Sequence, residues 1–260
     1  MNSMTDVRDL LAEKLLDNEF VVDKTGALTI ELLGESFVVE GNVIFGKLNE
    51  DYAKKELDWY TSESLNVYDM PNPPIIWRQI ANKDGDINSN YGWCIWSKEN
   101  GSQYSNTLRE LRKNKDSRRA SMIYTRPTMH TDYNDLGMSD FICTNAVTFA
   151  IRNNKLNCVV QMRSNDLVFG YLNDSYWHKF VLSELYGDLI IDYPELELGD
   201  IVWNSASAHI YERHFYYVYH YMKTGETTIL KKAFREKYKH MIVVENNIDY
   251  FIDGNIKFKF

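Results

Sequence analysis

Apolar side chains recur at helical spacing along several stretches of the chain. In residues 5–17, Val7, Leu10, Leu11 and Leu15 fall on one face of a helix. Similar spacing predicts further helices over residues 51–60, 104–111, 173–186 and 209–221. The last two stretches are rich in aromatic rings, which indicates that large flat side chains fill much of the interior.

Other stretches are apolar and β-branched, as strands are. They cover residues 21–45, where Gly26, Gly34 and Gly41 separate them, and residues 121–125, 149–160, 167–169 and 201–203. Residues 241–260 alternate around Asp253-Gly254, which predicts a C-terminal β-hairpin. Because strands and helices are intermixed without a regular β-α-β repeat, the predicted class is α+β, a mixed sheet packed with helices. No repeat or linker interrupts residues 1–260, so a single domain is expected.

Length and charge restrict the classes of function. The 260 residues are enough for one large core. A net charge of −8 does not suit a protein that follows a nucleic acid, although a few arginines would still bind a small anion. The N-terminus is too charged for a signal peptide, and no apolar run approaches the roughly 20 residues that span a bilayer. We therefore expect no membrane partner and no direct contact with nucleic acid.

The three cysteines are Cys94, Cys143 and Cys158. This sparse, odd set predicts neither a disulfide framework nor a metal site, and it indicates a reducing cytoplasm. Cys94 lies between two tryptophans and Cys158 in a strand-like run, so both are expected to be buried. A lone cysteine is more often a small core residue than a nucleophile, so Cys143 carries little weight by itself.

The motifs that follow Cys143 change that interpretation. Arg163-Ser164-Asn165-Asp166 begins twenty residues later, and Gly170 and His209-Ile210-Tyr211 come after it. This succession resembles the thymidylate synthase family, in which a nucleophilic Cys precedes Arg-Ser-x-Asp, a Gly and His-x-Tyr. Further segments resemble other motifs of that family: Asp23-Lys24-Thr25-Gly26, Glu56-Leu57-Asp58-Trp59, Asp84-Gly85-Asp86 with Asn90-Tyr91-Gly92, and Asp116-Ser117-Arg118-Arg119.

Within that family, the phage deoxycytidylate (dCMP) hydroxymethylases look most similar, for example in residues 21–26, 122–127, 137–141 and 162–166. The resemblance implies transfer of a one-carbon unit from 5,10-methylenetetrahydrofolate to C5 of dCMP. Capture by water would then give 5-hydroxymethyl-dCMP and tetrahydrofolate, without a metal. It also implies a homodimer in the cytoplasm of a phage host, with other enzymes of nucleotide biosynthesis as possible partners.

The resemblance also assigns the reacting group and the phosphate ligands. The Cys143 thiolate would add to C6 of the pyrimidine, and the positive Arg163 would favour that thiolate. The 5′-phosphate would be held by Lys24, Arg118, Arg119, Arg163 and Ser164. Arg118 and Arg119 would reach in from the neighbouring subunit, although without the other motifs they would be interpreted as a solvated turn. Lys24 departs from the Arg of the family and loses its paired donors.

Other side chains are expected to move protons and to hold the two substrates. Glu56 would order a water and assist proton transfer, and Tyr91 would assist removal of the C5 proton. The alternative for Glu56 is an exposed helix residue. Trp77 and Asp166 are expected at the folate. The residues expected on dCMP are Asn165, Asp166, Gly170, His209 and Tyr211, the last two at the 3′-hydroxyl of deoxyribose.

Asp174 is expected to distinguish cytosine from uracil. Thymidylate synthases have Asn at the matching position, where one amide satisfies the N3–H donor and O4 acceptor of uracil. Cytosine presents an N3 acceptor and an N4 donor, which a carboxyl that shares a proton with N3 satisfies. Asp174 therefore predicts dCMP rather than dUMP. Two alternatives stay open: that the neighbouring Asn173 occupies this place, or that Asp174 only supports a helix N-terminus.

No single residue separates hydroxymethylation from reductive methylation. The chain lacks the short apolar tail that closes thymidylate synthases, which is consistent with entry of water. A dCMP methylase or a thymidylate synthase is therefore the alternative. A non-catalytic nucleotide-binding relative is a third hypothesis, which the presence of Cys143, Glu56 and Arg163 disfavours.

Overall fold

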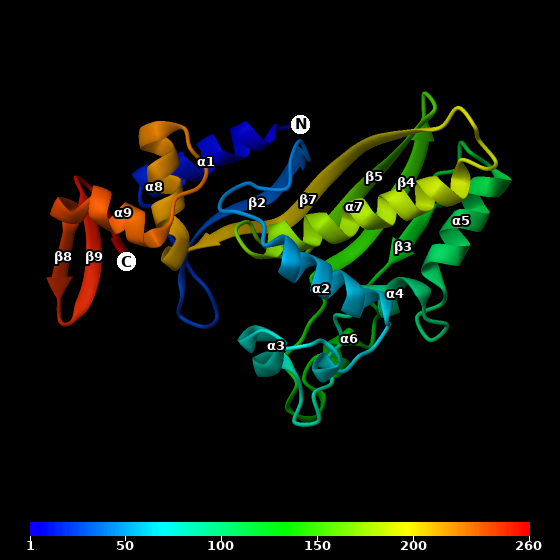
Figure 1. The fold of residues 1–260 in the computed structure, drawn as a ribbon, viewed down its shortest axis with the longest axis horizontal. Coiled ribbons are helices and arrows are strands. Elements are labelled where there is room, and N and C mark those ends of the chain that lie inside the picture. The colour runs from blue at the N-terminus through cyan, green and yellow to red at the C-terminus, as the bar shows by residue number, and fades with distance from the viewer. The chain divides into compact units, whose positions relative to one another are not determined.

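A computed structural model describes all residues from Met1 to Phe260. The strands form a seven-stranded sheet and a second sheet of three strands, with helices packed beside them (Figure 1). In the larger sheet the order is β1-β2-β7-β5-β4-β3, and the short β6 pairs with β7 in parallel. The predicted α+β class with a mixed sheet is confirmed. None of the helices is long and apolar enough to cross a bilayer.

The chain divides into two compact units. Unit 1 comprises Met1–Leu48, Ser164–Ser175 and Ser205–Phe260, and unit 2 comprises Asn49–Arg163 and Tyr176–Asn204. Two elements, α7 (Gly170–Leu189) and β7 (Glu197–Tyr211), contribute residues to both units. The expectation of a single catalytic domain stays a prediction.

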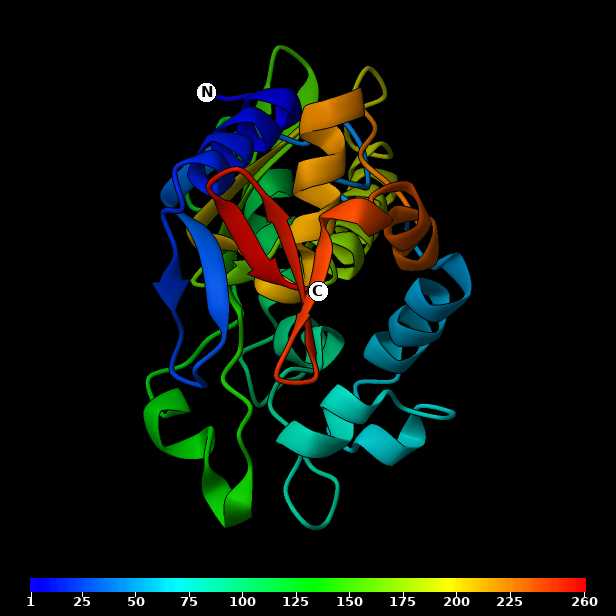
Figure 2. The ribbon, with the colours of Figure 1, turned by 90° about the vertical axis from the view of Figure 1, so that its left-hand side faces the viewer.

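Unit 1 begins with a capped amphipathic helix, α1. Ser3 caps it in a capping box with Asp6, which satisfies N–H groups that the first turn leaves without partners. Its buried face packs beside α8 (Figure 1, Figure 2), and the helix predicted over residues 5–17 is confirmed. The elements of this unit besides α7 and β7 are α1 (Met4–Leu16), β1 (Val21–Val22), β2 (Leu28–Val38), β6 (Asn165–Asp166), η3 (Glu212–His214), α8 (Phe215–Thr224), α9 (Lys231–Lys237), η4 (Lys239–Met241), β8 (Ile242–Glu245), β9 (Ile248–Asp253) and β10 (Ile256–Lys259).

The C-terminal segment of unit 1 is a three-stranded antiparallel meander rather than a single hairpin. The turn between β9 and β10 is Gly254-Asn255, one residue later than the predicted Asp253-Gly254, because Asp253 pairs with Ile256. A second turn at Asn246-Asn247 joins β8 to β9. Both asparagines of this second turn have positive φ, as tight two-residue hairpin turns require. Phe251 and Phe258 of this sheet stack with ring centroids 4.9 Å apart and are buried. Phe251 also contacts Tyr219 of α8 and Phe234 of α9, so the meander (red in Figure 2) shares its core with these helices.

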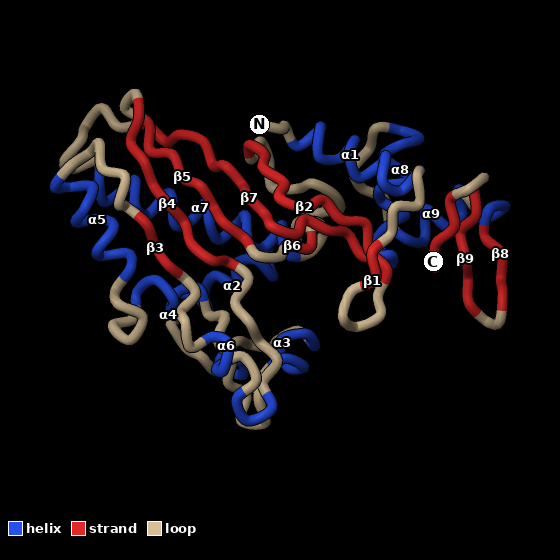
Figure 3. Tube along the Cα trace, turned by 180° about the vertical axis from the view of Figure 1, so that it is seen from behind, coloured by secondary structure: helices blue, strands red, loops and turns tan.

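Unit 2 is built on the antiparallel hairpin of β4 (Thr144–Arg152) and β5 (Lys155–Met162) (Figure 3). The two-residue turn is Asn153-Asn154, again with positive φ at both positions. The strand-forming stretch predicted over residues 149–160 is therefore confirmed as parts of two strands, joined by a turn that the prediction did not include. The remaining elements besides α7 and β7 are α2 (Glu50–Thr61), η1 (Val67–Asp69), α3 (Ile75–Ile80), α4 (Tyr91–Trp96), α5 (Gln103–Lys113), β3 (Ser121–Ile123), α6 (Met129–Asp132) and η2 (Asp135–Gly137).

Aromatic rings make up much of the core of unit 2. The Trp177 ring on α7 contacts the rings of Tyr60 and Trp96, and its indole N–H donates to the Tyr124 hydroxyl at 3.1 Å. Trp177 and Trp203 are both almost fully buried. This confirms the interior of flat side chains that the composition indicated.

Three further predictions differ from the structure. β2 runs through Gly34 without a break and residues 39–45 contain no strand, so Gly34 and Gly41 do not separate strands there. The helix predicted over residues 209–221 begins only at Phe215, because His209–Tyr211 end the long strand β7. Aromatic residues are common in both helices and strands, so composition did not separate the two. Residues 167–169, predicted as a strand, form a turn before α7. Their apolar side chains Leu167 and Val168 are buried there without strand pairing.

Two glycines of unit 2 are expected to respond in opposite ways to alanine. A Cβ on Gly92 of α4 would lie 1.8 Å from the Tyr60 carbonyl oxygen, whereas a Cβ on Gly187 of α7 meets nothing within 4 Å. We predict that Gly92→Ala destabilises the protein by about 3 kcal/mol or more, since backbone must move. Gly187→Ala should instead stabilise it by up to about 1 kcal/mol through helix propensity. Urea unfolding measures both, and a Gly92→Ala variant as stable as the parent would contradict the close approach of α2 and α4.

Candidate functional site

Cys143 and Arg163 lie at the open end of the β4–β5 hairpin. Cys143 directly precedes β4 and Arg163 directly follows β5, and the paired residues next to them are Thr144 and Met162. The Arg163 main-chain N–H donates to the Cys143 carbonyl at 2.9 Å. The Nη2 of Arg163 lies 3.4 Å from Cys143 Sγ. A guanidinium at this distance favours the thiolate over the thiol, so the hairpin brings the candidate nucleophile and a charge that would activate it together.

Most other donors of Arg163 hold the segment that carries the nucleophile. Its Nε donates to the Ile142 carbonyl at 2.9 Å, and Nη2 donates to the Phe141 carbonyl. The guanidinium also lies 4.9 Å from the centroid of the Phe141 ring. Arg163 therefore positions the loop before Cys143, a role that the sequence motif did not indicate.

A buried carboxylate anchors the same loop from the other side. Asp140 is 4% exposed and accepts from Asn88 N at 2.7 Å, Ser89 N at 2.8 Å and Ser89 Oγ at 2.6 Å. Burial raises the pKa of Asp140 above its ordinary value, while these hydrogen bonds and the Arg163 charge oppose the rise. Asn90, the residue after Ser89, caps α4. Asp140 therefore joins the nucleophile loop, the segment from Asp140 to Cys143, to the start of that helix.

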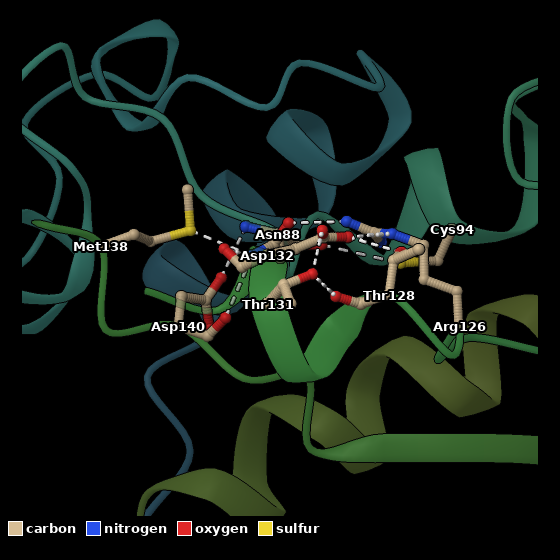
Figure 4. A network of polar contacts seen from close by, with 8 residues as sticks. All are labelled: Asn88, Cys94, Arg126, Thr128, Thr131, Asp132, Met138 and Asp140. Atoms are coloured by element: carbon tan, nitrogen blue, oxygen red, sulfur yellow. Dashed lines mark hydrogen bonds and ion pairs between the residues drawn. The ribbon is translucent and has the colours of Figure 1, made fainter. Parts of the chain in front are cut away.

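Asn88 is the centre of this polar network (Figure 4). Its Nδ2 donates to the carbonyls of Asp140 and Asp132, and its Oδ1 accepts from Arg126 Nη2 at 2.7 Å. Arg126 Nε in turn bonds the Asp132 carboxylate at 2.8 Å, which Thr128 also contacts. Residues 126–140, a long excursion between β3 and β4, are thus held to the stretch before α4.

Glu56 is a buried acid with a strongly altered pKa. It is 5% exposed on α2, and its Oε1 accepts from the Tyr52 hydroxyl at 2.6 Å and from the Trp77 indole N–H at 3.1 Å. Burial raises the pKa of Glu56 to about 7, although both hydrogen bonds lower it. The alternative of an exposed helix residue is therefore wrong. Near neutral pH this carboxyl exchanges a proton readily, which suits a general acid or base.

Tyr91 and the double arginine differ in exposure. Tyr91 is 4% exposed at the start of α4, and its ring stacks on Tyr60 at a centroid distance of 5.2 Å. Arg118 and Arg119 are exposed in the loop after α5. Arg119 bonds the Glu110 carboxylate through Nη2 at 3.0 Å and Nε at 3.1 Å. This exposure is compatible with a contact to another subunit, which stays a prediction.

In unit 1, Lys24 lies at the tip of a tight loop after β1. The Asp23 Oδ1 accepts from Thr25 N at 2.8 Å, Thr25 Oγ1 at 2.6 Å and Ala27 N at 3.0 Å. These bonds, the Thr25 side chain first, hold the pKa of Asp23 below its ordinary value. Gly26 has a φ of +83°, which favours glycine. The loop is therefore ordered by its own carboxylate and presents the Lys24 ammonium to solvent.

The strands β6 and β7 bring Asp166, His209 and Tyr211 together in unit 1. Asp166 is the parallel partner of His209, and the His209 and Tyr211 rings meet edge to face at 5.1 Å. Arg213 lies over the Tyr211 ring at 4.2 Å, with its Nη2 3.6 Å from Asp166 Oδ2. Burial raises the pKa of Asp166, and the nearby His209 and Arg213 oppose this.

Asn165 and Asp174 form a second close pair in unit 1. Asn165 Nδ2 donates to Asp174 Oδ2 at 2.7 Å, and Gly170, in the first turn of α7, leaves room beside both. Asp174 is partly exposed. Asn173 instead bonds weakly to the Phe169 carbonyl at 3.4 Å. Ser164 is partly exposed in the link between β5 and β6.

Sequence reasoning missed the partners of these side chains more than the side chains themselves. Tyr52 lies four residues before Glu56 on the same helix, so helical spacing was a signal for it. Asp140 and Asn88 are 52 residues apart, and no local pattern joins them. The other two cysteines are buried as expected, and burial raises the pKa of each thiol to about 12.

The sequence profile of the thymidylate synthase family matches residues 21–251 of the chain. The deoxycytidylate 5-hydroxymethyltransferase of enterobacteria phage T6 is 53% identical to it, over 92% of this chain and 99% of that protein. The protein of the same name from phage T4 is also 53% identical, over 91% of this chain and 98% of its own length. A thymidylate synthase of Buchnera aphidicola is 28% identical, over 74% of this chain and 73% of its own.

Solved thymidylate synthases have the same fold. Thymidylate synthase A from Bacillus subtilis aligns with a TM-score of 0.62 at 21% identity, covering 85% of this chain and 84% of its own. Thymidylate synthase from phage T4 aligns with a TM-score of 0.64 at 20% identity, covering 80% and 77%. These likenesses concern the fold and confirm the architecture that the motifs predicted.

The raised pKa of Glu56 predicts a pH dependence of stability. The folded chain keeps a proton up to about pH 7 that the unfolded chain loses near pH 4.5. The contribution of the Glu56 proton to the free energy of unfolding is therefore fully present below pH 4.5 and is lost as the pH rises through about 7. The change is about 3 kcal/mol at most. We predict that Glu56→Gln matches the parent near pH 4 and exceeds its free energy of unfolding near pH 8 by about this amount. Equal curves of stability against pH would contradict a buried, proton-binding Glu56.

The Asp140 anchor predicts a loss of order in the nucleophile loop. Asp140→Ala leaves two N–H groups and a hydroxyl without their acceptor, which we expect to cost about 3 kcal/mol. Asp140→Asn keeps one acceptor oxygen and should cost much less. Alkylation by iodoacetamide under native conditions reports Cys143, because the other two cysteines are at most 1% exposed. An Asp140→Ala variant with unchanged stability and unchanged alkylation rate would refute the anchor.

Proposed function

The chain belongs to the thymidylate synthase family, and we propose that it is a deoxycytidylate 5-hydroxymethyltransferase. The observation that carries this proposal is the 53% identity to phage proteins of that name over nearly the whole of both chains. In the proposed reaction, C5 of dCMP loses a proton and gains a hydroxymethyl group. Its carbon comes from 5,10-methylenetetrahydrofolate and its oxygen from water, so tetrahydrofolate leaves without net oxidation.

We assign the first bond to Cys143. Its thiolate adds to C6 of the cytosine ring, which gives C5 the electron density of a carbanion. The guanidinium of Arg163, 3.4 Å from the sulfur, favours the thiolate, and the anchored loop limits the positions that the sulfur can take. Elimination of the same thiolate restores the ring after C5 has reacted.

We assign cytosine recognition to Asp174. A carboxyl that shares a proton with N3 and accepts from the N4 amine satisfies both groups on that edge of cytosine. The same proton offsets negative charge on the ring while the thiolate adds. The close hydrogen bond that the carboxyl accepts from Asn165 supports this assignment over the neighbouring Asn173, which bonds only weakly to the Phe169 carbonyl.

We assign proton transfer and the ordering of water to Glu56. A pKa of about 7 gives both protonation states near neutral pH, as the loss of the C5 proton and the addition of water require. Tyr52 fixes the carboxyl from the same helix, and Trp77 fixes it from α3. Tyr91 would assist at the C5 proton from its ordered place at the start of α4.

Phosphate and sugar contacts follow the family motifs. The proposed phosphate ligands are Lys24, Arg118, Arg119, Arg163 and Ser164. Arg118 and Arg119 would act from the second subunit of a homodimer, which their exposure supports. Because Nε and Nη2 of Arg163 already donate to carbonyl groups, Nη1 is the donor best suited to the phosphate. His209 and Tyr211 would hold the deoxyribose 3′-hydroxyl, with Gly170 and Asp166 close to the nucleotide.

The folate co-substrate fits the side chains assigned to it. When bound, it supplies a one-carbon unit at the oxidation level of formaldehyde. A pterin is a flat ring with amino and N–H donors, and it needs an aromatic surface and carboxylate acceptors. Trp77 offers an indole ring, and the partly exposed Asp166 offers an acceptor. A place in the host-cell cytoplasm, and association with other enzymes of nucleotide biosynthesis, stay predictions.

The reaction itself is tested with C5-tritiated nucleotides and methylenetetrahydrofolate. We expect tritium release from dCMP, 5-hydroxymethyl-dCMP by mass spectrometry, and no dihydrofolate. Cys143→Ser should lower the rate about a thousandfold or more, because the first bond cannot form. The matched control, Cys158→Ala, removes a buried thiol without this role and should stay active. Release mainly from dUMP together with dihydrofolate would instead identify reductive methylation.

A further inference from the structure

The environment of Asp174 contains Asn165, which the family resemblance places directly on dCMP. Asn165 is 2% exposed, and its Nδ2 donates to Asp174 Oδ2 at 2.7 Å. Its Nδ2 is engaged with that carboxylate and its Oδ1 is buried, so the amide contacts Asp174 rather than open solvent. It is well placed to act on the carboxyl in front of it.

The backbone of Asn165 is fixed independently of Asp174. Residue 165 lies in β6, where it is the parallel partner of Ala208 in β7. Strand β6 has only two residues. The residue after it, Leu167, adds a further main-chain bond, because its N–H donates to the His209 carbonyl at 2.9 Å. The amide that faces Asp174 is thus carried by a residue whose backbone pairs in the sheet, rather than by an unpaired loop.

The orientation of the amide is set by Asp174. The Oδ1 of Asn165 is buried without a hydrogen-bond partner, so only the Nδ2 side of the amide is satisfied. A buried acceptor without a donor costs about 1–3 kcal/mol. The hydrogen bond from Nδ2 to a carboxylate is charge-assisted, and it offsets that cost.

Gly170 makes this close arrangement possible. A Cβ at Gly170 would lie 3.3 Å from Asn165 Nδ2 and 3.6 Å from Asp174 Oδ2. The first distance is tight and the second is an ordinary van der Waals contact, so an added Cβ would press mainly on the Asn165 amide. The glycine of the motif is explained here by the space that the pair needs.

We propose that Asn165 is a positioning residue that orients the Asp174 carboxyl and thereby sets the preference for cytosine. The proposal rests on the proposed function. With Oδ2 accepting from Asn165, a proton on Asp174 is placed on Oδ1, since an oxygen that already accepts a strong hydrogen bond is the weaker base. The donor also prevents rotation of the carboxyl, which would exchange its two oxygens.

The first experiment compares Asn165→Ala with the matched control Asn173→Ala. Asn173 is on the same helix turn as Asp174 but bonds only the Phe169 carbonyl. For Asn165→Ala we expect kcat/KM for dCMP to fall at least tenfold, while the inhibition constant of dUMP as a competitor changes less than twofold. Asn173→Ala should leave both values unchanged. Asn165→Ser serves as a second variant if the alanine variant is unstable, because its short hydroxyl cannot reach Asp174.

A double-mutant cycle with Asp174→Asn separates positioning from general damage. If Asn165 acts through the carboxylate, Asn165→Ala should change dCMP turnover and dUMP binding less than twofold once Asp174 is already Asn. Equal losses in both backgrounds, or equal losses for dCMP and dUMP, would overturn the inference. If the parent protein does not act on dCMP, the proposed function fails instead. An active parent whose Asn165→Ala variant keeps its preference for dCMP refutes only the inference.

Discussion

The contact between Arg163 and the segment before Cys143 is the interaction on which the rest of unit 2 depends. It exists because an antiparallel hairpin brings the residue before its first strand next to the residue after its second. The spacing of twenty residues between Cys143 and Arg163 is therefore the length of the β4–β5 hairpin with its two-residue turn. A slip of one residue in register would turn the side chains of β5 to the opposite face and move the guanidinium away from the sulfur. The spacing between Cys143 and Arg163 in the motif is thus determined by the register of β4 and β5.

The acids of the chain show how environment divides one chemical group into several roles. Asp23 accepts three local hydrogen bonds near the surface, and its pKa is lowered. Asp140 also accepts three, yet burial outweighs them and raises its pKa. Glu56 has only two donors and is as deeply buried, and its pKa reaches about 7. The number of donors and the degree of burial together decide which carboxyl holds structure and which exchanges protons.

Local patterns predicted the long helices and the motif residues. They failed where no residue type marked the feature, or where it depended on contacts between residues far apart in the sequence. The helices over residues 5–17 and 51–60 have a buried stripe that recurs along their whole length, which makes them visible in the sequence. The turns at Asn153-Asn154 and Asn246-Asn247 were missed because no glycine marks them, although asparagine also tolerates positive φ. The end of β7 was taken for a helix because His209 and Tyr211 precede a real aromatic helix. Among functional residues, Glu56 was predicted but its burial was not, because that depends on α3 folding back over α2.

The proposed recognition of cytosine also depends on a contact that the sequence did not predict, the one between the Asn165 amide and the Asp174 carboxylate. Asp and Asn have nearly the same shape, so exchanging one for the other changes hydrogen-bonding polarity and charge far more than packing. A carboxylate at position 174 needs a donor behind it, and the amide of Asn165 supplies one at 2.7 Å while its own oxygen stays unpaired. An amide at position 174 would offer both a donor and an acceptor, so Asn165 could face it with either Nδ2 or Oδ1. Under our proposal, specificity for the base is a property of the pair: Asp174 contacts the ring, and Asn165 determines which oxygen carries the proton.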